Sequence, residues 1–193
     1  MIYRIEKNRI EYYDRGSGMK HIDDYLEPER VNAMLDAANA CSSRDYLMLR
    51  ILWRSGIRVS ELVNIRLKDI EWDNCVVNIL KAKGGKQRRV LLDSETISSL
   101  SRYVSDTELG DENCLFPLTR RHVWHLVKKY GRMVGVDVHP HTLRHSYAIN
   151  MIRNGVDIRR VQLLLGHAGI QTTTVYLQFK DADLREVYDK VEF

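Results

Sequence analysis

The sequence has few cysteines and no long apolar run. Its three cysteines, Cys41, Cys75 and Cys114, form an odd set with no CxxC pair and no zinc-ligand spacing. A membrane span needs about 18 apolar residues in a row, and no stretch of the sequence approaches this length. The charged opening MIYRIEKNR lacks the apolar region of a signal peptide. We therefore expect a reduced, cytoplasmic protein with no membrane partner.

The length and composition indicate one folded domain. A chain of 193 residues can bury one substantial core but is too short for two domains of ordinary size. Hydrophobic residues at 44% and charged residues at 29% are typical of folded soluble chains, which excludes wholesale disorder. The sequence contains no internal repeat and no low-complexity tract.

The charges are unevenly distributed, although the net charge is only +4. The run KAKGGKQRR at 81–89 holds five bases and no acid, and residues 114–156 hold seven bases and one acid. Residues 93–113 have six acids and one base. A domain with a basic side suits a polyanion such as nucleic acid, whereas ordinary solvated faces are the alternative explanation.

The N-terminal third is expected to be helical after an arm. Residues 1–24 lack clear periodicity and end in a Gly/Ser cluster, so they indicate an arm or linker. Pro28, followed by apolar residues at i, i+3, i+4 and i+7 spacing, predicts a helix. A second helix is predicted from an N-cap near Ser43 to Gly56, which can supply the positive φ of a helix end. A short helix over 59–65 follows.

The rest of the chain predicts a small sheet and then helices. Three β-prone runs at 70–72, 75–80 and 88–92 predict an antiparallel sheet. Helical patterns follow, with Thr119 as the cap of the first. Further helices are predicted over 142–154 and 158–165, around Tyr176, and over the apolar positions of 184–191. The expected fold class is mixed α+β and mainly helical.

Five short motifs hold residues that could carry chemistry, and each motif alone is weak evidence for a site. Arg58 and Glu61, at i and i+3, could form a simple surface ion pair, and Lys83 could lie in a solvated turn. His141 and Arg144 share a helix face that could surround a small anion. The last two motifs are LLGH at 164–167 and TTTVY at 172–176, whose histidine and tyrosine are usually structural when isolated.

The order of these motifs resembles the catalytic domain of the tyrosine recombinases, also called the phage integrase family. The resemblance runs from about Leu26 to about Lys180. It comprises a G-x-R-x-x-E-L motif at 56–62, a hairpin lysine, an H-x-L-R-H motif at 141–145 with a following alanine, and an L-L-G-H box with a tyrosine nine residues later. The sequence lacks the histidine often found just after that tyrosine.

The resemblance implies the recombinase catalytic-domain fold and its chemistry. In this family a tyrosine attacks a DNA phosphodiester and forms a 3′-phosphotyrosyl link, with no metal or nucleotide cofactor. The resemblance assigns seven positions: Tyr176 as nucleophile, Arg58 and Arg144 as phosphate clamp, Lys83 as general acid, His141 as acid or base, His167 as hydrogen-bond donor and Glu61 as supporting residue.

The resemblance also implies double-stranded DNA as partner. The family places the helix that here begins at Thr119 against the major groove. A tetramer on paired sites and an accessory directionality or DNA-bending protein are further expected partners. The candidate DNA-binding residues lie in the hairpin and at the start of this helix: Lys81, Lys86, Arg88, Arg89, Arg120, Arg121 and His122.

The expected domain organisation has three parts. Residues 1–24 form the N-terminal arm or linker, residues 25–180 the catalytic domain, and residues 181–193 a C-terminal helix that is exchanged between subunits or packs on its own domain. Most family members carry a further helical domain ahead of the catalytic one. The chain is therefore either a naturally short integrase or a catalytic fragment.

Three other functions are weighed against the recombinase. A relaxase resembling a type IB topoisomerase would relax any supercoiled plasmid without a specific site. A DNA-binding regulator derived from a recombinase would have no chemical reason to keep all six catalytic positions. A metal-dependent nuclease built on His139, His141 and His145 would lose activity in EDTA, but the HExxH glutamate is absent, so no metal is expected.

Overall fold

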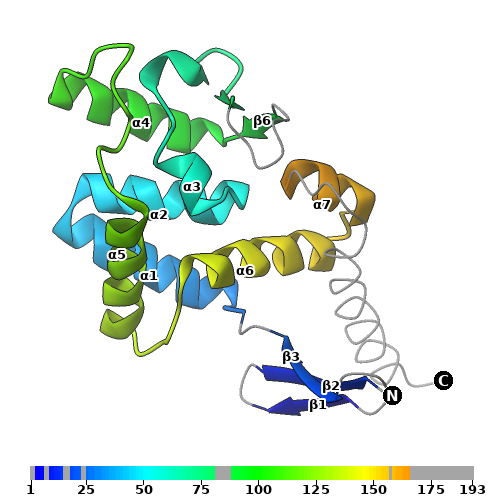
Figure 1. Cartoon of the computed structure of the whole chain (residues 1–193). Coiled ribbons are helices and arrows are strands. Elements are labelled where there is room, and N and C mark those ends of the chain that lie inside the picture. The colour runs from blue at the N-terminus through cyan, green and yellow to red at the C-terminus, as the bar shows by residue number, and fades with distance from the viewer. Residues whose placement is uncertain are drawn as a thin grey trace.

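The computed structural model describes residues 3–6, 9–14, 18–22, 25–80, 88–156 and 158–165. Within these ranges the protein is mainly helical, with two small three-stranded antiparallel sheets (Figure 1). The expected mixed α+β fold class is thereby confirmed. None of the helices in the described part of the chain is long and apolar enough to cross a membrane.

Helix α2 (Ser43–Ser55) lies at the centre of the helical body. It packs against α1 (Pro28–Cys41), α4 (Ser94–Thr107) and α6 (Pro140–Arg153) (Figure 1). A helix with neighbours on several sides must be apolar on several sides, and α2 buries Leu47, Met48, Leu49, Ile51, Leu52 and Trp53. Its N-cap is Ser42, one residue before the predicted position, and Gly56 ends it with a φ of 59°, as predicted.

The apolar faces predicted for two further helices are buried. Helix α1 buries Val31, Met34, Leu35 and Ala38, and α5 (Arg120–Met133) buries Val123, Leu126, Val127 and Tyr130. The Thr119 side chain caps α5 as predicted, accepting a hydrogen bond from the His122 amide at 3.2 Å. Helix α6 begins two residues earlier than predicted because the His139 ring caps it, accepting from the Thr142 amide at 3.3 Å.

The predicted sheet is confirmed as β4 (Ile70–Glu71), β5 (Val76–Ile79) and β6 (Arg88–Leu91), in the order β4-β5-β6. The short 3-10 helix η1 (Leu67–Asp69) leads into it. Helix α3 (Val59–Leu62) is three residues shorter than predicted. The chain leaves the helix early because the Ile65 carbonyl accepts a hydrogen bond from the Leu115 amide at 2.8 Å.

The sequence predicted the helix over 158–165 but not the strands at the N-terminal end. Strands β1 (Tyr3–Glu6), β2 (Arg9–Asp14) and β3 (Gly18–Ile22) form a second sheet in the segment for which the sequence predicted no regular element. Helix α7 (Ile158–Leu165) has the predicted bounds. The helices predicted around Tyr176 and over 181–193 lie outside the described residues, so the three-part organisation stays a prediction.

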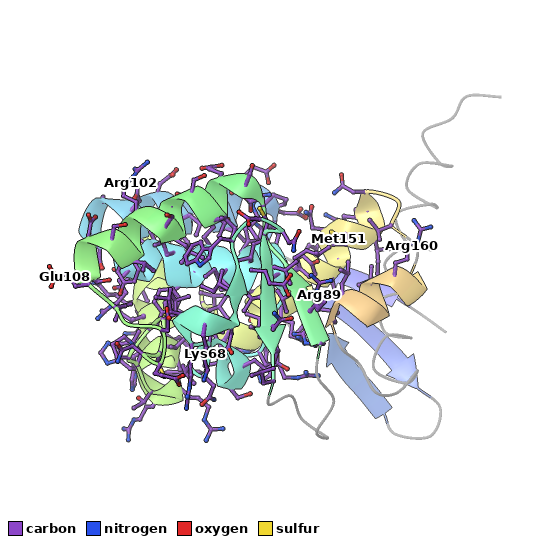
Figure 2. The ribbon with its side chains drawn as sticks, turned by 90° about the horizontal axis from the view of Figure 1, so that it is seen from above. Lys68, Arg89, Arg102, Glu108, Met151 and Arg160 are labelled. Carbon is purple, nitrogen blue, oxygen red and sulfur yellow. The ribbon has the colours of Figure 1, made fainter. Side chains whose placement is uncertain are left out.

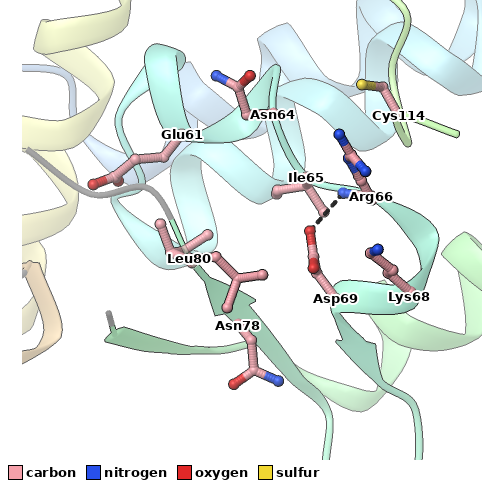
Figure 3. A pocket seen from close by; sticks show the side chains of 10 residues that line it. Glu61, Asn64, Ile65, Arg66, Lys68, Asp69, Asn78, Leu80 and Cys114 are labelled. Atoms are coloured by element: carbon pink, nitrogen blue, oxygen red, sulfur yellow. Dashed lines mark hydrogen bonds between the residues drawn. The ribbon is translucent and has the colours of Figure 1, made fainter. Parts of the chain in front are cut away.

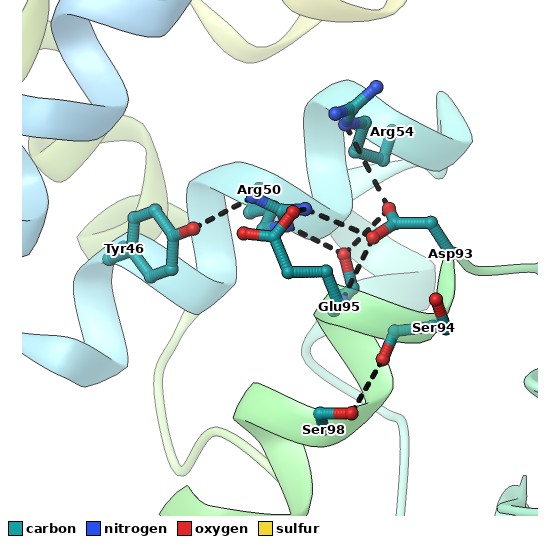
Figure 4. Close-up of polar contacts among 8 residues, drawn as sticks. Tyr46, Arg50, Arg54, Asp93, Ser94, Glu95 and Ser98 are labelled. Carbon is teal, nitrogen blue, oxygen red and sulfur yellow. Dashed lines mark hydrogen bonds and ion pairs between the residues drawn. The ribbon is translucent and has the colours of Figure 1, made fainter.

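Helix α4 docks onto α2 through a buried arginine. The Arg50 side chain, with 7% of its surface exposed, forms ion pairs with Asp93 at 3.0 Å and Glu95 at 2.7 Å (Figure 4). It also donates hydrogen bonds to the hydroxyls of Thr96 and Tyr46, at 2.7 and 2.8 Å. Since Asp93 is also the N-cap of α4, this cluster fixes the start of that helix.

This cluster predicts a stability loss in acid. Burial opposes ionisation of Asp93, but the hydrogen bonds from Thr96 and Arg50 outweigh it and lower its pKa from 3.8 to about 2. A carboxyl group whose pKa is lower in the folded state than in the unfolded state stabilises the fold at pH values above its unfolded-state pKa. This stabilisation is lost as the pH falls towards the folded-state pKa. We expect Asp93→Asn, which keeps an N-cap side chain, to be less stable than wild type near neutral pH. Thermal melts should show this difference shrinking between about pH 4 and about pH 2; an equal difference at both extremes would contradict the prediction.

Candidate phosphate-binding site

The first turn of α6 and the turn before α3 border a small pocket, which we call the arginine pocket. Its volume is about 170 Å³. It brings together three predicted catalytic residues from distant parts of the sequence, Arg58, His141 and Arg144. Arg120, at the start of α5, also lines it. Guanidinium groups and an imidazole around one hollow can surround a small anion such as a phosphate group.

Arg58 is held by its own helix start. Gly56 turns the chain out of α2, and Arg58 is the N-cap of α3. The Glu61 carboxylate accepts hydrogen bonds from the Arg58 backbone amide and from its Nη1, both at 3.0 Å. The predicted i, i+3 pair therefore exists, but it is not the surface ion pair of the simpler interpretation, because Glu61 is only 3% exposed.

Glu61 has a second cationic partner, Arg88 of β6. The Arg88 Nη2 lies 2.8 Å from Glu61 Oε2. Burial acts to raise the pKa of Glu61, but the hydrogen bonds from Arg88 and from the Arg58 amide outweigh it and hold the pKa below its usual value. Glu61 is therefore an anion at neutral pH that joins two arginines.

Arg144 is more deeply buried than Arg58 and His141, with only 7% of its surface exposed. Its Nη1 donates to the Gly56 carbonyl at the end of α2, and its Nη2 donates to the Leu165 carbonyl at the end of α7, the latter at 2.8 Å. One side chain of α6 thereby links the ends of two other helices. These contacts fix the guanidinium plane relative to Arg58, two residues beyond Gly56.

Gly56 is a position where a side chain would be costly. A Cβ atom there would lie 2.6 Å from Tyr147 Cδ1 and 2.7 Å from Leu165 Cδ2, and φ is +59°. We expect Gly56→Ala to lose at least about 2 kcal/mol of stability, from the left-handed backbone and the overpacking together.

Thermal unfolding of Gly56→Ala should show a melting temperature lower by about 4–8 °C for a domain of this size. Gly155→Ala is the matched control, because Gly155 has a φ of +81° but no atom within 4 Å of the added Cβ. Gly155→Ala should lose only the stability that the left-handed backbone conformation costs. Equal losses in the two variants would show that the contacts of Gly56 with Tyr147 and Leu165 do not matter.

A larger pocket of about 340 Å³ lies between α3, η1 and β5 (Figure 3). Its charged side chains are engaged with each other or with nearby groups. Arg66 and Lys68 pair with Glu112 at 2.8 and 2.7 Å, and the Asp69 carboxylate accepts from the Arg66 amide at 2.9 Å. Glu61 lines this pocket while its partner Arg58 lines the arginine pocket. The three predicted catalytic residues that the structure describes thus line the smaller pocket, not the larger one.

Four of the predicted DNA-binding residues are exposed in the structure. Arg120, Arg121 and His122 form the exposed first turn of α5. Arg89 projects outward from β6 (Figure 2), with 61% of its side chain exposed, and pairs with Glu71 at 2.7 Å. All four are available to a large ligand.

Arg88 differs from the expectation that it contacts DNA. Its side chain is only 10% exposed and points into the domain, where it binds Glu61 and donates to the Leu164 carbonyl. Alternation along β6 explains this: Arg88 shares a strand face with buried Val90, whereas Arg89 lies on the opposite face. The basic run at 81–89 predicts DNA contact for both arginines, and the strand register is what separates them.

The remaining predicted site residues lie outside the described part of the chain: Lys81, Lys83, Lys86, His167 and Tyr176. The segment that contains the lysines connects β5 to β6, and Gly166 and His167 of the L-L-G-H box follow the last residue of α7. Among the residues that are described, no group of three or more His, Cys, Asp or Glu side chains is placed to hold a metal ion.

Sequence reasoning did not anticipate that Arg120 lines the arginine pocket. It was predicted only as a residue that contacts the DNA groove or backbone phosphates. Its place beside Arg58 and Arg144 depends on how the start of α5 approaches that of α6, which a single sequence does not encode in any local pattern.

Comparison with known proteins gives a consistent result. Residues 24–183 match the phage integrase family. The chain is 35% identical over 192 residues to a tyrosine recombinase of Pseudothermotoga lettingae, covering 96% of this chain and 67% of that protein. It is 36% identical over 182 residues to the tyrosine recombinase XerA of Pyrococcus horikoshii, covering 90% of this chain and 63% of that protein. The chain thus spans about two thirds of the length of these curated relatives.

Solved structures of the same kind share the fold. A crystal structure of XerA recombinase aligns with a TM-score of 0.77 and 28% identity, covering 90% of this chain and 66% of that one. The XerH site-specific recombinase bound to palindromic difH substrate, in a post-cleavage complex, aligns with a TM-score of 0.73 and 28% identity, covering 86% of this chain and 52% of that one. Since the family match covers most of the sequence, this chain belongs to the phage integrase family.

Proposed function

We propose that this chain cleaves and rejoins DNA at specific sites through a 3′-phosphotyrosyl intermediate, without a metal or a nucleotide cofactor. The observation that carries the proposal is the arginine pocket, where Arg58, His141 and Arg144 line one hollow. The XerH protein described above was captured with its DNA substrate after cleavage, which supports the same class of reaction for this chain.

The proposed reaction exchanges one phosphodiester for another. The Tyr176 oxygen attacks the phosphorus, the bond to the 5′-oxygen breaks, and Lys83 gives that oxygen a proton. Attack by a 5′-hydroxyl of a partner strand reverses the step and releases the tyrosine. Because a diester is present throughout, the bond energy is conserved and no nucleotide is consumed.

The arginine pocket would supply the transition-state stabilisation. Arg58 and Arg144 would bind the non-bridging oxygens of the phosphate, where the negative charge increases as the fifth bond forms. His141, exposed at the pocket, would move a proton near the tyrosine, and His167 would donate a hydrogen bond to the phosphate. Glu61 would orient Arg58, with which it already makes two hydrogen bonds.

The exposed basic residues would hold the duplex around this pocket. Arg120, Arg121 and His122 at the start of α5 would lie against the major groove, with Arg89, Lys81 and Lys86 on the backbone. We propose a tetramer on paired sites as the working assembly, with an accessory protein that bends DNA or sets direction. The compartment would be the cytoplasm.

A covalent-adduct assay tests the proposal directly. Wild-type protein is incubated in EDTA with DNA carrying the sequence that flanks its gene, and the reaction is quenched with SDS. We expect a protein-DNA adduct that withstands SDS, with the nucleotide mapped by mass spectrometry to the peptide containing Tyr176. Gel-shifted DNA without any adduct would instead favour a DNA-binding regulator. Cleavage that occurs in a parallel reaction without EDTA and is lost when EDTA is present would favour a metal nuclease.

A further inference from the structure

Arg88 contacts two different parts of the proposed active site at once. On one side its Nη2 binds Glu61, which in turn holds Arg58. On the other side its Nη1 donates to the Leu164 carbonyl in the last turn of α7. Its Nε has no hydrogen-bond partner among the described residues, so its polar contacts run through the two terminal nitrogens.

The end of α7 is held by two arginines in succession. Arg88 binds the carbonyl of Leu164 and Arg144 binds that of Leu165. Carbonyls in the last turn of a helix have no partner within the helix, and cations are favourable there. The next two residues are Gly166 and His167 of the L-L-G-H box. The last turn of α7 is therefore anchored by these two side chains.

We propose that Arg88 is a positioning residue for DNA cleavage, which aligns Arg58 through Glu61 and anchors the end of α7 that leads to His167. The inference rests on the proposed function for its effect on rate. Arg88 is also the first residue of β6, five positions after Lys83 in the sequence. One guanidinium thus joins Glu61, which holds Arg58, to the last turn of α7.

Two simpler roles make different predictions. A DNA-contacting arginine would affect affinity, but Arg88 points inward while its neighbour Arg89 points outward. A purely structural arginine would affect stability alone. Arg50 provides that comparison, because it is also mostly buried and paired with carboxylates, at the contact between α2 and α4 (Figure 4). It lines neither of the two pockets described above.

The experiment compares Arg88→Ala, Arg88→Lys and Arg50→Ala at a temperature where all are folded. Single-turnover cleavage of a nicked substrate is measured at saturating DNA, and Kd is measured separately. We expect Arg88→Ala to cleave about 10- to 100-fold more slowly, as for a misplaced catalytic group, with little change in Kd. Arg88→Lys should be intermediate, since one ammonium replaces two donors. Arg50→Ala should melt at a lower temperature and keep the wild-type rate.

A second readout separates this inference from the proposed function. The Nε–H NMR signal of Arg58, assigned with Arg58→Lys, should shift in Arg88→Ala and not in Arg50→Ala. If wild type forms no adduct but this shift occurs, the recombinase function fails while the coupling of Arg88 to Arg58 stands. An unshifted Arg58 signal, a wild-type cleavage rate in Arg88→Ala, or a loss confined to Kd would each overturn the positioning role.

Discussion

The Tyr176→Phe protein is expected to form no covalent DNA adduct and no recombinant product, while binding DNA as wild type does. The substitution removes only the hydroxyl that would attack the phosphorus. Tyrosine has a reference pKa of about 10, so ionising it at pH 7 costs about 4 kcal/mol. The phenylalanine ring that remains has no oxygen to attack the phosphorus, so the loss should reach the detection limit.

The SDS-quenched adduct assay measures this loss, and a gel shift at the same protein concentrations measures binding. Tyr147→Phe tests the rival nucleophile, because the Tyr147 ring packs against Gly56 beside the arginine pocket. Burial raises the pKa of Tyr147, although Arg88 and Arg144 oppose the shift, so it is the poorer candidate. An adduct that persists in Tyr176→Phe and disappears in Tyr147→Phe would reverse the assignment.

The elements that sequence predicted well are those with a local signal. Helices α1 and α5 have an apolar stripe on one face and an end marked by Pro28 or Thr119. Helix α4 was given no bounds, because its sequence SETISSLSRYVSDT is rich in Ser and Thr, which are weak helix formers. Its stability comes from docking, through Arg50 at its start and buried Ile97, Leu100 and Tyr103 along its length.

The candidate site also has residues that the sequence predicted and contacts that it did not. The order of the motifs led to Arg58, His141 and Arg144, which the fold does bring to one pocket. The resemblance also implied Glu61 as a supporting residue, and it does bind Arg58, but the contacts of Arg144 and Arg88 could not be read from the sequence. The link from Arg144 to the carbonyls of Gly56 and Leu165 spans residues far apart in the chain. The inward direction of Arg88 follows from strand register, and one residue of slip would have exchanged it with Arg89.

Arg144→Ala is expected to lower the rate of DNA cleavage at saturating DNA by about 10²- to 10³-fold or more. Removing one neutral oxyanion donor has that effect in other enzymes, and here a full charge is lost. Arg144→Lys should recover little, because an ammonium lacks the planar fork that can hold two carbonyls and a phosphate together. The carbonyls of Gly56 and Leu165 would also lose a donor, which should cost about 1–3 kcal/mol of stability.

Arg153→Ala is the control on the same helix, because Arg153 makes an ion pair with Glu27 at 2.8 Å remote from the arginine pocket. It should change stability by less than about 1 kcal/mol and leave cleavage unchanged. Single-turnover kinetics give the rate, thermal melts give the stability, and added guanidinium should restore part of the activity of Arg144→Ala if the pocket itself stays formed. Cleavage by Arg144→Lys close to the wild-type rate would show that charge alone suffices, and the bidentate clamp would then have to be abandoned.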